Sequence, residues 1–231
     1  MSEDCSRDRS SVAGIIFRAG ELEVNLPEAE TDLDALISLS PRVLSRFQTL
    51  FQEVEPERRR FGWMLGQIFG VYHGLDHWVR VGIYGLAIAR ALRDQGRVRT
   101  AGLAPERALE DAVLWAAFFH DCGRIGEGEE PDHGRTADRA WRQYADRVRL
   151  SRELAAAVSQ ALLFHVDHQP VDPAANEVAI CLCNADRLDR VRLGQAPRPA
   201  WMYDDGIWQK LAPLSEKLLA EFSLAKVKTI L

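Results

Sequence analysis

The chain has 231 residues, enough for one domain with a sizeable core, and a second full domain is not required. Its hydrophobic fraction of 47% and charged fraction of 27% are those of ordinary water-soluble globular proteins. A formal net charge of -5 argues against a general nucleic-acid binder or membrane-surface binder. No apolar stretch approaches the roughly 20 residues of a membrane span, and the N-terminus has no apolar signal core, so we expect a cytoplasmic protein.

Residues 1–55 are predicted to form an N-terminal extension that packs on a helical domain of residues 56–231. Between residues 14 and 27 the apolar positions alternate loosely around Gly20, which predicts a short hairpin. Residues 33–51 carry apolar side chains at helical spacing, interrupted at Pro41, which predicts two helices or one kinked helix.

A long apolar segment, residues 78–92, follows a polar break at residues 72–77. The segment predicts a buried helix, and Gly82 and Gly85 would let another helix approach it closely. His77 is expected in the first turn of this helix.

Residues 112–119 include no charged side chain, so a helix here is apolar on every side and belongs in the protein interior. This helix delivers His120 and Asp121 to the interior. A buried imidazole and a buried carboxylate need partners, and a divalent metal is one partner that suits both. Gly123 is expected to stop the helix.

Two further histidines lie at expected helix boundaries or faces. His133 stands where a loop rich in glycine and glutamate, residues 124–131, enters a helix. Ser151 is the predicted N-cap of the next helix, and His165 falls on the apolar stripe of that helix.

The last part of the chain continues the helical pattern. Asp172 and Pro173 are predicted to open a helix that carries Asp186 on its apolar side. Pro213 is predicted to start a final helix. Cysteines are sparse and none forms a C-x-x-C pair, which argues against a disulfide framework or a zinc ribbon and favours buried thiols at Cys181 and Cys183. We therefore predict an all-α fold, an irregular bundle of helices.

Three segments together are similar to a known signature. They are His77-x-x-Arg80-Val81, His120-Asp121 and residues 185–189 (Ala-Asp-Arg-Leu-Asp). In this order and helical context, over residues 72–195, they resemble the H…HD…D signature of the HD-domain metal-dependent phosphohydrolase superfamily. The resemblance implies a helical bundle in which four residues hold one divalent metal ion: His77, His120, Asp121 and Asp186.

The resemblance also allows a second ion. In superfamily members with two metals, histidines between the HD pair and the last aspartate hold the second ion, and the HD aspartate bridges both. His133 and His165 occupy these places, with His168 as an alternative to His165. One or two ions are expected, and mixed nitrogen and oxygen ligands do not distinguish Mn, Mg, Ni, Fe and Zn.

The expected partner is a small anionic, phosphate-containing substrate. Its candidate binding residues are Arg124, Arg135, Arg187 and His73. A guanidinium presents a planar fork to phosphate oxygens, although each arginine could equally be a surface residue paired with a carboxylate. The candidate catalytic residues are Asp121, His133 and Arg124, with Asp121 or a histidine assisting proton transfer.

Three functions are compatible with these residues. The leading hypothesis is hydrolysis of a phosphate mono- or diester, with nucleotides among the candidates, by attack of a metal-bound hydroxide. The second is a di-iron oxygenase, because one branch of the superfamily uses a six-ligand arrangement with iron. The third is a sensor that keeps a metal or a nucleotide without turning it over.

Overall fold

The computed structural model describes residues 33–54, 70, 72–98, 107–126, 128, 130–166, 175–203 and 206–223. The secondary structure of these residues is helical, without strands, which confirms the predicted all-α class. The α-helices are α1 (Leu33–Val54), α3 (Leu75–Asp94), α4 (Ala108–Phe119), α5 (His133–Tyr144), α6 (Arg152–Phe164), α7 (Glu177–Leu188), α8 (Trp208–Leu211) and α9 (Ser215–Glu221). Short 3-10 turns are η4 (Ala145–Arg147), η5 (Asp189–Leu193), η6 (Pro199–Trp201) and η7 (Ala212–Leu214). The predicted hairpin at residues 14–27 lies outside the described residues.

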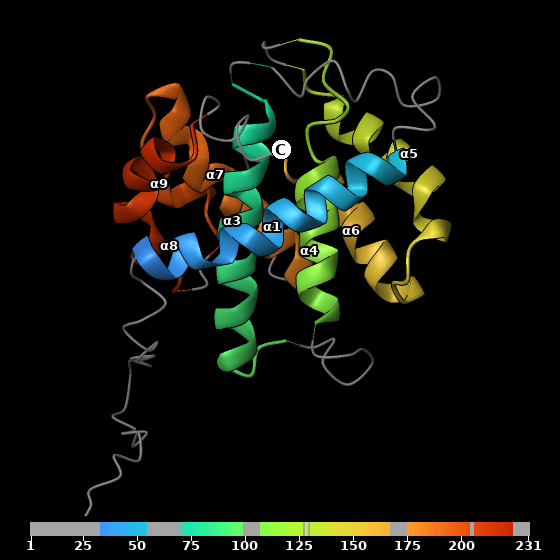
Figure 1. Ribbon diagram of the computed structural model, residues 1–231, viewed down its shortest axis with the longest axis horizontal. Coiled ribbons are helices and arrows are strands. Elements are labelled where there is room, and N and C mark those ends of the chain that lie inside the picture. The colour runs from blue at the N-terminus through green and yellow to red at the C-terminus, as the bar shows by residue number, and fades with distance from the viewer. Residues whose placement is uncertain are drawn as a thin grey trace, which may run out of the picture.

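Helices α3 and α4 lie side by side at the centre, and α1 crosses both of them (Figure 1). Helix α7 packs against α3 and α4, and α6 packs against α4, α5 and α7. Helices α8 and α9 lie at one end of the bundle, and α5 at the other (Figure 1). None of the helices in the described part of the chain has the length and apolarity needed to cross a membrane.

The two glycines of α3 are close-approach positions, as predicted. A Cβ atom at Gly82 would stand 2.7 Å from Cγ1 of Val43 in α1, and one at Gly85 would stand 2.6 Å from Cγ1 of Val113 in α4. Real Cβ contacts are longer than this, so the absence of a side chain lets both neighbours pack against the backbone of α3.

Helix α4 is buried through its whole apolar run, which confirms the prediction for residues 112–119. The role predicted for Gly123 was wrong. The helix ends at Phe119, and Gly123 is not in the left-handed conformation of a helix C-cap. A Cβ at Gly123 would instead stand 2.9 Å from the backbone nitrogen of Ala137, so this glycine lets α5 pack against the turn after α4.

Residues 33–54 form one helix that continues through Pro41, so the predicted alternative of two helices was wrong. Proline lacks the N–H that would bond to the carbonyl of Ile37, four residues before it. The hydroxyl of Ser40 donates to that carbonyl at 2.7 Å and satisfies it. Leu36, Val43 and neighbouring residues of α1 join the same hydrophobic core as α3 and α4. The predicted boundary at residue 55 stays a prediction.

The starts of α6 and α7 are fixed by side-chain caps. The hydroxyl of Ser151 accepts from the Leu154 N–H at 3.2 Å, as predicted. Helix α7 begins at Glu177, where Asn176 accepts from the Ala179 N–H at 2.9 Å. It therefore begins later than predicted, and residues 172–173 lie outside the described residues. Pro213 lies in the η7 turn and not at the first position of α9.

Candidate metal centre

Six side chains from five places in the fold converge on one buried point. His77 comes from the first turn of α3, and His120 and Asp121 follow the end of α4. The others lie at the start of α5, just after α6, and in the last turn of α7: His133, His165 and Asp186. All are buried except Asp186, whose side chain is 17% exposed.

The first group of atoms surrounds Nε2 of His77. This atom lies 3.0 Å from Nε2 of His120, 3.3 Å from Oδ2 of Asp121 and 3.3 Å from Oδ1 of Asp186. His77, His120 and Asp186 offer ligand atoms close enough together to hold one ion, and His77 and Asp121 form an overlapping group of this kind with His73. Such mixed nitrogen and oxygen ligands suit a divalent ion and leave positions open for water or substrate.

A second group lies on the other side of Asp121. Nε2 of His133 is 3.5 Å from Oδ1 of Asp121 and 2.9 Å from Nε2 of His165. Asp121 therefore offers one oxygen to each group and is placed to bridge two ions.

The other ring nitrogen of each histidine is anchored. Nδ1 of His120 donates to the carbonyl of Ala117 at 2.8 Å, and Nδ1 of His165 to that of Leu162 at 2.7 Å. Nδ1 of His133 donates to the carbonyl of Glu130. A carbonyl can only accept, so each of these Nδ1 atoms carries a proton and the Nε2 atom of each ring faces the cluster.

The two histidines of the second group are neutral and turn their Nε2 atoms toward each other. Burial lowers the pKa of His133 and is the largest cause that holds the pKa of His165 well below its usual range. Both rings are thus neutral, and their Nε2 lone pairs face each other at 2.9 Å with no proton between them. A metal ion gives both lone pairs a partner, so these residues fit a metal.

The first group also concentrates charge. Burial opposes ionisation of Asp121, but His120, His73 and His77 hold the pKa of that carboxyl well below its usual range. Burial disfavours the charged form of His77, yet hydrogen bonds to carboxylates such as Asp186 raise its pKa to about 9. The carboxylates are therefore ionised, and a positive charge is stabilised at Nε2 of His77.

Comparison with protein families matches residues 74–191 to the HD domain. The chain belongs to the HD domain family. Comparisons with curated proteins and with solved structures returned no match. The matched segment carries all six converging residues of this HD domain, and members of the family bind divalent metals.

A glycine, Gly134, allows the start of α5, which carries His133, to lie close to the end of α6, which is followed by His165. Gly134 follows His133, and a Cβ there would stand 2.6 Å from the carbonyl oxygen of Leu162 near the end of α6. Only a residue without a side chain allows this approach, which brings His133 to His165. His168, the alternative to His165, lies outside the described residues.

Asp189 and Arg80 belong to the signature segments, and the structure shows that they support the metal centre, a role that the sequence did not predict. Asp189, fully buried, accepts from Nδ1 of His77 at 2.7 Å. It also accepts from Nε and Nη2 of Arg80 at 2.7 and 3.0 Å, and Arg80 in turn donates to Asp76. The sequence signal was an arginine inside an apolar helix, which needs a buried carboxylate partner.

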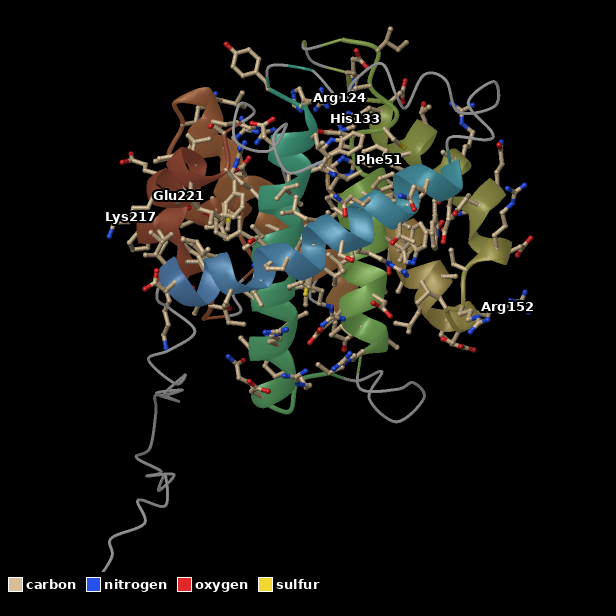
Figure 2. The ribbon with its side chains drawn as sticks, in the orientation of Figure 1. Phe51, Arg124, His133, Arg152, Lys217 and Glu221 are labelled. Carbon is tan, nitrogen blue, oxygen red and sulfur yellow. The ribbon has the colours of Figure 1, made fainter. Side chains whose placement is uncertain are left out.

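The proposed substrate-binding arginines occupy different environments. Nε of Arg124 donates to Oδ1 of Asp121 at 2.7 Å, and Figure 2 shows Arg124 beside His133. The Arg135 side chain is 78% exposed and lies 3.6 Å from Asp132, so it belongs to the surface of α5. Arg187 is buried, and its Nη1 donates to the carbonyl of Trp201, which accounts for it as a structural residue.

His73 contacts the cluster directly and forms, with His77 and Asp121, a group that could hold a metal ion. It precedes α3, and its Nδ1 lies 2.8 Å from Oδ2 of Asp121. Burial lowers the pKa of His73, so the ring is neutral and its Nδ1 proton is donated to Asp121. The structure thus places His73 and Arg124 on the two oxygens of the same carboxylate.

Proposed function

We propose that this HD domain is a metal-dependent phosphohydrolase that acts on a phosphate mono- or diester. The observation that carries the proposal is the arrangement around Asp121. Each of its two oxygens faces imidazole Nε2 atoms, and the Nδ1 atoms of those rings are held by hydrogen-bond acceptors. This arrangement is suited to hold a cation, which would give the facing Nε2 lone pairs of His133 and His165 a partner.

A divalent ion, when bound, would neutralise charge developing on a phosphoryl oxygen and lower the pKa of a coordinated water. The chain supplies the rest. Arg124, which donates to Asp121, stabilises negative charge on a phosphate beside the cluster. Asp121 fixes the position of both His73 and Arg124 through its two oxygens.

His73 is the best placed residue to carry a proton. Its Nδ1 proton is held by Asp121, which leaves the Nε2 lone pair to accept a proton, the role of the imidazole in an Asp–His pair. His133 is less suited, because its Nδ1 is engaged with Glu130 and its Nε2 faces His165.

The test is hydrolysis by protein of known metal content. Protein as isolated is analysed for its metals, stripped, reloaded separately with Mn²⁺, Ni²⁺, Mg²⁺, Fe²⁺ or Zn²⁺, and assayed on phosphate monoesters, phosphodiesters and nucleotides. We expect activity with at least one ion, and its loss together with metal retention in His120→Ala. The proposal fails if metal-loaded protein hydrolyses none of these compounds.

A di-iron oxygenase is the second candidate, favoured by the second group of His133, His165 and the shared Asp121. The six-residue set resembles the arrangement that one branch of the superfamily uses with iron. Two irons per chain with a mixed-valence electron paramagnetic resonance signal would support it. Phosphatase activity that depends on a redox-inert ion such as Mg²⁺ would count against it.

A further inference from the structure

Arg192, in η5, is an almost buried arginine beside the cluster, and nothing in the signature points to it. Its side chain is 7% exposed. Nε donates to the carbonyl of Tyr72 at 2.6 Å and Nη1 to the carbonyl of Asp189 at 3.1 Å. Two backbone carbonyls therefore fix the plane of the guanidinium.

The remaining nitrogen, Nη2, faces the cluster and lacks an acceptor. It lies 3.5 Å from Nδ1 of His73 and 3.8 Å from Oδ1 of Asp186. Nδ1 of His73 carries a proton for Asp121, so it cannot accept another from Arg192. The Asp186 oxygen is beyond hydrogen-bond reach. Among the described residues, the Nη2 protons of Arg192 have no good partner.

Arg124, which binds Oδ1 of Asp121, has a second spare donor. Its Nε donates to Oδ1 of Asp121 and its Nη1 to the carbonyl of Gly128 at 3.0 Å. Its Nη2 has no acceptor within the described part of the chain. The side chain is 13% exposed, so this group is held in place but still reachable from solvent.

We propose that Arg192 and Arg124 form a clamp for the non-bridging oxygens of a phosphate group, and that the substrate is a phosphate monoester. Fixed guanidinium groups with unused N–H donors match the planar geometry of phosphate oxygens. The inference rests on the proposed hydrolase function and narrows its substrate class.

Charge favours the monoester over the diester. Asp121 and Asp186 carry two negative charges, which the two arginines already balance, so every divalent ion bound there leaves the centre positive. A monoester carries close to two negative charges at neutral pH because its second pKa is near 6, whereas a diester carries one. The dianion compensates the centre better and offers one more oxygen to the clamp.

The experiment compares Arg192→Gln, Arg192→Lys and the parent, all metal-loaded. Arg93→Gln is the matched control, since Arg93 is a half-exposed arginine in the last turn of α3, far along the helix from His77. Metal content and thermal midpoint are measured for every variant. Binding of inorganic phosphate is measured by calorimetry, and kcat/KM is measured for an aryl phosphate monoester and for the matching diester.

We expect Arg192→Gln to weaken phosphate binding and lower kcat/KM for the monoester by about 10- to 100-fold, the range for one charge-assisted hydrogen bond. The kcat/KM for the diester should fall by a smaller factor. Arg192→Lys should give values between those of Arg192→Gln and the parent, and Arg93→Gln should give the parental values. Unchanged phosphate affinity in Arg192→Gln, or equal losses for monoester and diester, would overturn the clamp.

The clamp and the hydrolase proposal fail separately. If phosphate binding depends on Arg192 but the protein has no hydrolytic activity, the clamp proposal stands and the hydrolase proposal is rejected. If Arg192→Gln keeps its metal content and hydrolyses monoesters at the parental rate, the hydrolase proposal stands and the clamp proposal is rejected.

Discussion

Nε2 of His133 lies 2.9 Å from Nε2 of His165, and each ring turns its Nδ1 to a backbone carbonyl. Two neutral imidazoles cannot form a hydrogen bond in this orientation, because both facing atoms are acceptors. A cation shared by the two nitrogens and Asp121 would give both acceptors a partner. Substitution of a residue in the second group is therefore the sharper test of metal binding.

His165→Ala is expected to lower the metal stoichiometry of loaded protein from two ions per chain to one, because the first group around His77 remains complete. The measurement is elemental analysis after removal of free metal. Leu163→Ala is a matched control, since Leu163 lies two residues away and is 38% exposed. Equal stoichiometry in His165→Ala and the parent would contradict the role of His165.

Metal binding is expected to release protons. The pKa of His77 is raised to about 9, so in metal-free protein at pH 7.5 this ring is protonated and must lose its proton to bind an ion. Metal affinity should therefore rise with pH until about 9. Calorimetry at pH 7.5 in two buffers of different ionisation enthalpy should show about one proton released by the first ion. Identical heats in the two buffers would refute this.

Asp189→Ala is expected to destabilise the metal-free protein by about 3–5 kcal/mol, because it leaves the buried Arg80 guanidinium without its bidentate partner. Chemical denaturation measures the free energy of unfolding. Asp94→Ala is the control: Asp94 pairs with Arg93 in an exposed position and should cost at most about 1 kcal/mol. Similar losses for the two variants would show that Asp189 has no special structural role.

Gly134→Ala is expected to cost about 1–3 kcal/mol of stability, since the added Cβ would meet the carbonyl of Leu162. The displacement should separate His133 from His165 and weaken the second ion more than the first. Gly128→Ala is the control, because nothing lies near a Cβ at that position. Retention of two ions with parental affinity in Gly134→Ala would argue that the spacing of α5 and α6 is not critical.

Local patterns predicted a good part of the fold. The uncharged run of residues 112–119, the Ser151 cap and the small residues Gly82 and Gly85 each report on a single helix or on its immediate contacts. The errors came from compensation that local rules do not include. Pro41 does not break α1, because Ser40 satisfies the carbonyl that proline leaves free.

By itself, the sequence determined that the chain is helical and that a His-Asp pair follows an apolar helix, because periodicity and hydrophobicity are properties of neighbouring residues. Only the tertiary structure decided which distant groups surround that pair. It placed Arg192 beside Asp186 and left Arg187 buried against Trp201, although both arginines follow the same aspartate closely in sequence. The direction of each guanidinium depends on how η5, α7 and the turn before α3 pack together, which no local pattern encodes.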